Sequence, residues 1–378
     1  MATTAAAQTE KLSFTSSRAM LWTLLVVYIL NFLDRQIVAI LAEPMKREFG
    51  LSDTQLGLLA GPAFAVFYAV LGIPIARYAD KASTNRVWLI SISLAVWSGM
   101  TAVCGLAQNF LQLALARVGV GVGEAGCTPA AHSLIADSVP PEKRSSAIAF
   151  YGLGIPIGGL LGLVIGGIVN DLYGWRAAFM IVGAPGILLA FVLPKLIRDP
   201  RRFGDSQNPA GTPAAKPALT VSEAAREIFA SKAYLYIFIA ASFTAFLSYG
   251  KGLWTISFFI RSHGFSTTEA GIAMAVALGL SGIVGTWLGG KMADVFGERD
   301  KRHLLTMPAL GMMIAAPLLF VSYWSTDWRV AVAMLIIPTI LNSAYYGPAY
   351  GCVQGLVRRE ARAVAASLVV FGQNLIGL

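Results

Sequence analysis

The chain is a succession of long apolar runs separated by short polar segments. Runs of about 20 residues are long enough to cross a hydrocarbon core of about 30 Å as a helix. Ten such runs lie near residues 20–42, 54–78, 87–108, 110–137, 146–169, 176–197, 234–260, 269–293, 304–324 and 328–356, and an eleventh begins near Val364. None alternates with the period of two that marks barrel strands, and backbone groups in lipid must be paired within their own segment. The pattern predicts an all-α polytopic membrane protein.

Composition and charge agree with this class and add an orientation. Hydrophobic residues make up 56% of the chain and charged residues 13%, with a net charge of +9. If the N-terminus is cytoplasmic, 21 of the 29 Lys and Arg fall in inner segments. The outer segments hold Lys46, Arg47, Arg176, Arg261 and Arg329. Because basic residues concentrate in cytoplasmic loops, we expect a cell-membrane protein with a cytoplasmic N-terminus, and the positive charge reflects topology rather than nucleic-acid binding.

The chain contains an internal repeat. GLSDTQLG at 50–57 returns as GFSTTEAG at 264–271, each with a Ser followed three residues later by Gln or Glu, the pattern of a helix-capping box. The repeat predicts two related bundles, 19–197 and 233–378, after a cytoplasmic tail at 1–18. Matching the halves by the repeat places the last residue in mid-span, so we expect the second bundle to lack the end of helix 11 and helix 12.

The segment between the bundles, 198–232, is predicted to be a cytoplasmic linker because it is rich in Pro, Gly and Arg. Within it, TVSEAAREIFASK has a capping-box pattern at Thr220 and Glu223 and predicts a short amphipathic helix on the inner surface.

Four charged residues lie inside predicted spans. Arg117 and Glu124 are seven residues apart in span 4, which places them about 10.5 Å apart on one helix face. Asp34 and Arg35 reach a similar depth in span 1, so the two sets can meet. A charge at the centre of a spanning helix costs about 2.5–3.5 kcal/mol on insertion scales and usually marks function. We interpret Glu124 as the first candidate proton carrier and Asp34 as the second. Arg117 and Arg35 would be counter-charges that also hold an anionic headgroup; the alternative is a static paired network.

The loop ARYADKASTNR at 76–86 resembles the cytoplasmic loop motif of the major facilitator superfamily, and GKMADVFGERDKR is a second copy in the second half. The resemblance implies two pseudo-symmetric six-helix bundles that rock about a central substrate. It also implies a conformational latch that includes Asp80, Lys81, Arg86, Arg144 and Asp294. The alternative for these residues is a set of solvated loop charges.

Three further segments resemble the spinster family of facilitators: YILNFLDR at 28–35, ARVGVGVGEAGCTPAAHSLIADSVPPEKRSSA at 116–147, and FYGLGIPIGG at 150–159. This resemblance implies proton-coupled alternating access for an amphipathic, anionic lipid such as a lysophospholipid or a sphingoid phosphate. The Asn and Asp-Arg pair of span 1 also occur in organic-anion facilitators, which keeps small organic anions or drug-like compounds open as substrates. A membrane-embedded lipid enzyme is disfavoured because no nucleophile and base pair is evident.

Glycines form a stripe in span 5, where Gly154, Gly158 and Gly162 recur every four residues beside Pro156 and Gly159. Such stripes are typical of close helix packing. The same segment, FYGLGIPIGG, resembles a motif of exchangers in the superfamily. This resemblance implies that Pro156 bends the helix and that the protein is an antiporter.

Other polar and aromatic residues of the spans are weaker candidates. Asn31, Tyr249 and Trp254 are predicted to line the substrate cavity, and His132 is either a proton relay or a packing residue. The cysteines lie in apolar spans without metal-ligand spacing. We therefore expect a monomer that works among membrane lipids, with no metal, cofactor or nucleic acid.

Overall fold

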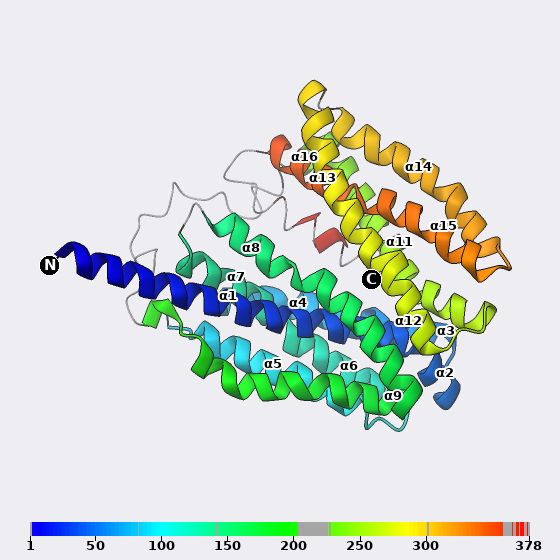
Figure 1. Cartoon of the computed structure of the whole chain (residues 1–378), viewed down its shortest axis with the longest axis horizontal. Coiled ribbons are helices and arrows are strands. Elements are labelled where there is room, and N and C mark those ends of the chain that lie inside the picture. The colour runs from blue at the N-terminus through cyan, green and yellow to red at the C-terminus, as the bar shows by residue number, and fades with distance from the viewer. Residues whose placement is uncertain are drawn as a thin grey trace. The chain divides into compact units, whose positions relative to one another are not determined.

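The computed structural model describes residues 2–81, 83–140, 143–202, 226, 228–300, 302–357, 365, 368–369, 371–373 and 376. Within these residues the chain forms helices joined by short turns, with no strand. It divides into two compact units, Met1–Pro213 and Ala214–Leu378 (Figure 1).

The described residues contain nine helical segments that are long and apolar enough to cross a membrane. They are Arg18–Ile40, Asp53–Ala79, Arg86–Cys104, Phe110–Ser138, Ser146–Leu196, Lys232–Ser262, Thr267–Met292, His303–Trp324 and Trp328–Val353. The longest contains Gly174 with non-helical dihedral angles (φ 81°, ψ 163°), which separates the two spans predicted for this region. The ten complete spans expected from the sequence are therefore confirmed. The expected eleventh span lies mostly outside the described residues.

The first unit is built from α1 (Ala2–Ile40), α2 (Ala42–Phe49), α3 (Asp53–Ala60), α4 (Pro62–Asp80), α5 (Arg86–Cys104), α6 (Phe110–Glu124), α7 (Cys127–Ser138), α8 (Arg144–Gly152), α9 (Gly154–Leu196) and the short η2 (Pro200–Arg202). Helix α9 packs along both α1 and α5, while α6 packs against α4 and α5. Helix α1 also includes residues 2–17, most of the segment predicted to be a cytoplasmic tail.

The second unit is built from α11 (Lys232–Ser262), α12 (Thr267–Met274), the π-helix η3 (Ala275–Leu280), α13 (Ser281–Arg299), α14 (His303–Trp324), α15 (Trp328–Ser343) and α16 (Tyr346–Leu356). Helix α15 packs along α13 and α14.

The repeat seen in the sequence returns in backbone geometry. Ser52 and Gln55 form a complete capping box at the start of α3, and Ser266 and Glu269 form another at the start of α12. The glycine two residues before each capping serine is left-handed, with φ of 62° at Gly50 and 69° in the second copy. A left-handed residue strongly favours glycine, so the repeated glycine is explained as well as the cap.

Two predicted spans are interrupted at equivalent places. The span over 110–137 divides into α6 and α7, and the span over 328–356 into α15 and α16. Pro129 follows the first interruption and Pro348 the second, and each lacks the N–H that would bond the carbonyl four residues earlier. The residues at both interruptions, Ala125 and Gly126 in the first and Ala344 and Tyr345 in the second, keep right-handed helical dihedral angles. Each predicted span therefore remains one membrane-length helical segment with a local break in its hydrogen bonding.

The glycine stripe of α9 faces α1. A Cβ added to Gly158 would lie 2.3 Å from the backbone oxygen of Ile29, and one added to Gly162 would lie 2.8 Å from that of Leu33. A Cβ at Gly159 would have no atom within 4 Å. The stripe thus allows the backbones of α1 and α9 to approach, and Gly159 lies outside the contact.

Candidate functional site

The centre of the first unit holds a buried ion pair between two helices. Arg35 of α1 donates from Nε to Oε2 of Glu124, the last residue of α6, at 2.7 Å. The Glu124 side chain is 0% exposed and the Arg35 side chain 23%. Arg35 therefore connects a sealed carboxylate to a more open part of the unit, and the expected meeting of spans 1 and 4 is observed.

The other two buried charges lie beside this pair. Asp34 is 1% exposed and accepts a hydrogen bond from the Thr101 hydroxyl of α5. Arg117, 2% exposed, is the cation that acts most strongly on Asp34. With both carboxylates ionised, the four charges sum to zero, so the cluster can be buried without a net charge.

Aromatic rings enclose the two guanidinium groups. The Arg35 Cζ lies 4.8 Å from the ring centroid of Phe64 and 4.7 Å from that of Tyr68, both on α4. The Arg117 Cζ lies 5.3 Å from the same Phe64 ring. Such contacts stabilise a cation by about 0.5–2 kcal/mol each, more where water is excluded. Phe64 therefore holds both cations of the cluster, a role that a lone aromatic in an apolar span did not reveal.

Several buried polar atoms of the cluster have no hydrogen-bond partner within the described part of the chain. They are Asn31 Oδ1, Asp34 Oδ1, Arg117 Nε, Arg117 Nη1 and Glu124 Oε1. Leaving a buried polar group unpaired costs about 1–3 kcal/mol. The cluster is therefore poorly suited to stabilising the fold, and its free donors and acceptors can accept a proton or an anionic group.

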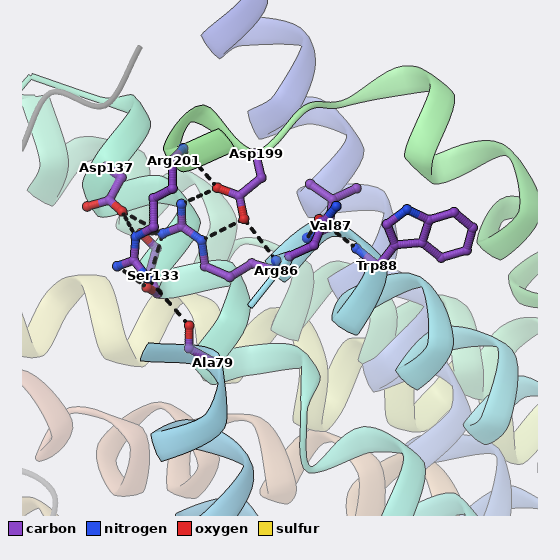
Figure 2. A network of polar contacts seen from close by, with 9 residues as sticks. Ala79, Arg86, Val87, Trp88, Ser133, Asp137, Asp199 and Arg201 are labelled. Carbon is purple, nitrogen blue, oxygen red and sulfur yellow. Dashed lines mark hydrogen bonds and ion pairs between the residues drawn. The ribbon is translucent and has the colours of Figure 1, made fainter. Parts of the chain in front are cut away.

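A second buried network lies at the end of the unit where the linker begins (Figure 2). Arg86, the first residue of α5, donates to both carboxylate oxygens of Asp199, and its Nη1 donates to Asp137 at 2.7 Å. Arg201 of η2 donates from Nε to the same Asp137 oxygen at 2.6 Å. Both arginines also reach the Ser133 hydroxyl. Two cations and two carboxylates are thus paired, and the linker's first turn is fixed to α5 and α7.

The electrostatics of Asp199 follow from these contacts. Burial by itself raises the pKa of Asp199, but the hydrogen bonds and positive charge of Arg86 outweigh it and hold the pKa below its usual value. Of the residues in this network, only Arg86 was among the candidates predicted from the sequence; Asp137, Asp199, Arg201 and Ser133 were not. A buried arginine at the start of a span requires a carboxylate partner, and the acidic residues that end two neighbouring spans were the available signal.

Of the remaining latch candidates, the structure describes the side chains of Lys81 and Arg144, and each contacts a residue of its own loop. Lys81 is exposed, with Nζ 5.8 Å from the Tyr78 ring centroid. Arg144 donates to the Val139 carbonyl at 3.1 Å, within its own loop. The side chains of Asp80 and Asp294 lie outside the described residues, as do Thr220 and Glu223 of the linker.

The predicted cavity residues are divided between the units. Asn31 is 1% exposed beside Glu124 in the first unit. Tyr249 and Trp254 lie on α11 of the second unit and are 46% and 36% exposed. Arg261 places its Cζ 5.8 Å from the Trp254 ring centroid.

Comparison with known proteins defines the class. The model of the Major Facilitator Superfamily matches residues 24–378. An "MFS-type efflux pump" of Mycolicibacterium smegmatis is 33% identical over 94% of this chain and 80% of its own length. The human "Protein spinster homolog 1" is 26% identical over 78% of this chain, and the match spans 58% of that protein.

A solved structure is similar over nearly the whole chain. It is the inward-facing, unoccupied form of a bacterial homologue of the human lysosomal transporter Spinster, with 36% identity, a TM-score of 0.88, and coverage of 96% of this chain and 80% of that one. The D-xylose-proton symporter shares the fold at 17% identity and a TM-score of 0.72. The chain therefore belongs to the major facilitator superfamily. It is a spinster-like, multi-pass membrane transporter and not an enzyme.

Proposed function

We propose that this transporter couples the movement of an amphipathic anion to protons through the cluster of Asp34, Arg35, Arg117 and Glu124. Glu124 is the principal proton carrier and Asp34 the second. Arg35 and Arg117 hold the anionic group of the substrate through forked hydrogen bonds.

The observation that carries this proposal is the contrast between the two buried networks. In the Arg86 network, no side-chain atom of Arg86, Asp137 or Asp199 is buried without a partner among the described residues. In the central cluster both carboxylates and Arg117 keep unpaired atoms. A network that only fixes packing is expected to be fully satisfied. The central cluster therefore supports a functional interpretation over the static one.

An anionic lipid is the first candidate substrate. Its charge complements the guanidinium groups of the cluster, and the similarity to spinster proteins supports it. The "Probable sphingolipid transporter spinster homolog 2" of Arabidopsis thaliana is 24% identical over 97% of this chain. A lysophospholipid or sphingoid phosphate would place its charged group on the guanidiniums and its hydrocarbon chain among apolar side chains. The second candidate is a small organic anion or a drug-like compound. The "Hexuronate transporter" of Bacillus subtilis, 24% identical over 72% of this chain, and the efflux pump above favour it.

The coupling follows from competition for Arg35. An anion that draws the guanidinium away from Glu124 removes the counter-charge of that carboxylate and favours its protonation. Anion and proton then assist each other's binding, which favours movement in the same direction. The exchanger-like glycine motif favours movement in opposite directions, so the two arguments make different predictions.

The transporter also needs a defined orientation in the membrane and a gate that opens and closes one side. The distribution of basic residues supports a cytoplasmic N-terminus in the cell membrane. In that orientation the Arg86 network of the first bundle (19–197) lies on the cytoplasmic side. The linker over 198–232, which connects this bundle in sequence to the second (233–378), lies on the same side. We propose a monomer in which the loop of Asp80, Lys81 and Arg86, with Arg144 and Asp294, closes and releases that side.

Purified protein in liposomes tests both substrate class and coupling. Labelled 1-oleoyl lysophosphatidate, sphingosine phosphate and glucuronate are offered with a pH gradient of either sign and without one. Gradient-driven movement of the two lipid anions supports the proposal, and the sign of the effective gradient gives the direction. Movement of glucuronate alone supports the second candidate. If every compound moves at a rate that does not depend on the pH gradient, proton coupling is contradicted.

A further inference from the structure

We propose that Tyr151 and His132 form a proton route between Glu124 and the exposed face of α7. The route rests on the proposed function, since it supplies the proposed carrier with protons. Glu124, Thr128 and His132 follow one another at intervals of four residues, the spacing of one helix face. The turn between α6 and α7 keeps right-handed helical dihedral angles at Ala125, so the face continues across it.

A stack of rings lies along this face. Tyr151 of α8 stacks on Tyr28 of α1 at a centroid distance of 4.1 Å, with an interplanar angle of 14°. The His132 ring meets Tyr151 edge-on at 5.5 Å and 77°. Tyr151 is 0% exposed, whereas His132 is exposed. The imidazole therefore joins a sealed phenol to the outside of the unit.

The Tyr151 hydroxyl is buried and makes no hydrogen bond of regular geometry among the described residues, although the side chains of Thr128 and Cys127 approach it. An unpaired buried hydroxyl costs about 1–3 kcal/mol and calls for an explanation. The Thr128 side chain lies beside this phenol and that of Tyr28. Neither group is permanently charged, so both can donate and accept hydrogen bonds.

The inner end of the route reaches the central cluster. Cys127 is 1% exposed, lies beside Tyr151, and is in the electrostatic field of Glu124 and Arg35. Polar hydrogens from Thr128, Tyr151 and Cys127 thus line the interval between Glu124 and His132. Every group in this interval can pass on a proton without becoming permanently charged.

The groups that face His132 are aromatic rather than charged. They are Tyr151 from α8 and, behind it, Tyr28 from α1. No charged side chain of the described residues acts on the imidazole. The neighbouring Arg86 and Arg201 bind Ser133, and their charges are matched by Asp137 and Asp199. No permanent ion pair therefore holds His132 in one protonation state. A residue that takes up protons and passes them on must be able to change its protonation state in this way.

The transfer moves one proton and no electrons. Protonated His132 donates to the Tyr151 oxygen, and the phenol hydrogen passes inward through Thr128 or Cys127 to the Glu124 carboxylate. Rotation of the Tyr151 hydroxyl then restores its starting orientation. The same steps in the reverse order carry the proton from Glu124 back to His132. If His132 only packed α7 against α8, its substitution would leave the rate of Glu124 protonation unchanged.

The test measures protonation directly and needs no substrate. Full-length protein in detergent is subjected to a jump from alkaline to acidic pH, and infrared absorption follows the appearance of protonated carboxyl groups. The signal that disappears in Glu124→Gln belongs to Glu124. Its rate is then measured in His132→Ala, with and without added imidazole, and in Tyr151→Phe, which keeps the ring and removes the hydroxyl. Matched controls in the second unit are His303→Ala and Tyr323→Phe.

We expect both route variants to slow the Glu124 signal by on the order of a hundredfold. Free imidazole should restore the rate in His132→Ala, which a packing role would not allow, while the two controls keep the wild-type rate. A Glu124 signal that appears at the wild-type rate in both route variants would overturn the route and leave the carrier intact. If Glu124→Gln removes no signal, Glu124 takes up no proton, and the proposed function fails together with the route.

Discussion

Replacing Asp199 by asparagine leaves the buried Arg86 guanidinium with one carboxylate instead of two. The Arg86 side chain is 0% exposed, and it uses Nε, Nη2 and its backbone N–H on Asp199. The remaining carboxylate, Asp137, is shared with Arg201. Two cations then face one anion in a buried site, and breaking a buried pair typically costs about 3–5 kcal/mol. We expect Asp199→Asn to lower the free energy of unfolding by about this amount.

The assay is unfolding of the purified protein by sodium dodecyl sulfate in mixed micelles, followed by loss of helical circular dichroism. The matched control is Glu48→Gln, because Glu48 pairs with Arg176 where both side chains are partly exposed, 46% and 35%. A partly exposed pair is expected to contribute only about 0–1 kcal/mol. If Asp199→Asn lowered the free energy of unfolding by no more than Glu48→Gln does, the network would not hold the linker to the unit.

The same variant has a defined pH dependence. The pKa of Asp199 is held below its usual value in the folded protein. Its ionised form therefore stabilises the fold above the unfolded pKa of about 3.9, and this contribution is lost as pH falls through the lower folded pKa. The difference between wild type and Asp199→Asn should be constant near neutrality and shrink at acid pH. A difference that grew on acidification would contradict the assigned pairing.

Two further substitutions test the packing around the cluster. Gly158→Ala places a Cβ 2.3 Å from a backbone oxygen of α1, so we expect a loss of about 1–3 kcal/mol in the same unfolding assay. Gly159→Ala meets no atom within 4 Å and should be neutral or stabilising; equal losses at both sites would refute the packing stripe. Phe64→Leu removes a ring that contacts Arg35 and Arg117. It should weaken lysophosphatidate binding in titration calorimetry by about twofold to thirtyfold, about 0.5–2 kcal/mol, whereas Phe64→Tyr keeps the affinity; equal affinity in both variants would contradict the role of the ring.

The membrane fold was predictable because its physical signal is local. Each span is an apolar run of sufficient length, and each capping box lies within four residues of sequence. The contact between Arg35 and Glu124 was also within reach, because helix rise places both residues at a common depth. No equivalent rule pointed to Thr101 as the donor to Asp34, since a single threonine in an apolar helix has no distinguishing pattern.

The Arg86 network was missed for a different reason. Asp199 lies 113 residues from Arg86, in a segment whose proline and arginine content indicated a linker. Its role depends on how α5, α7 and η2 meet, which composition does not encode. The interruption after Glu124 was within reach, since Pro129 removes a helical hydrogen bond, but the apolar pattern outweighed that signal.

The central claim concerns Glu124, and proton flux tests it most directly. Liposomes containing wild type, Glu124→Gln or the control Glu48→Gln, with a pH-sensitive dye inside, receive an outward gradient of 1-oleoyl lysophosphatidate. Wild type and the control should move protons when the lipid moves. Glu124→Gln should still bind the lipid but move no protons with it. Lipid-driven proton movement at the wild-type rate in Glu124→Gln would contradict the account.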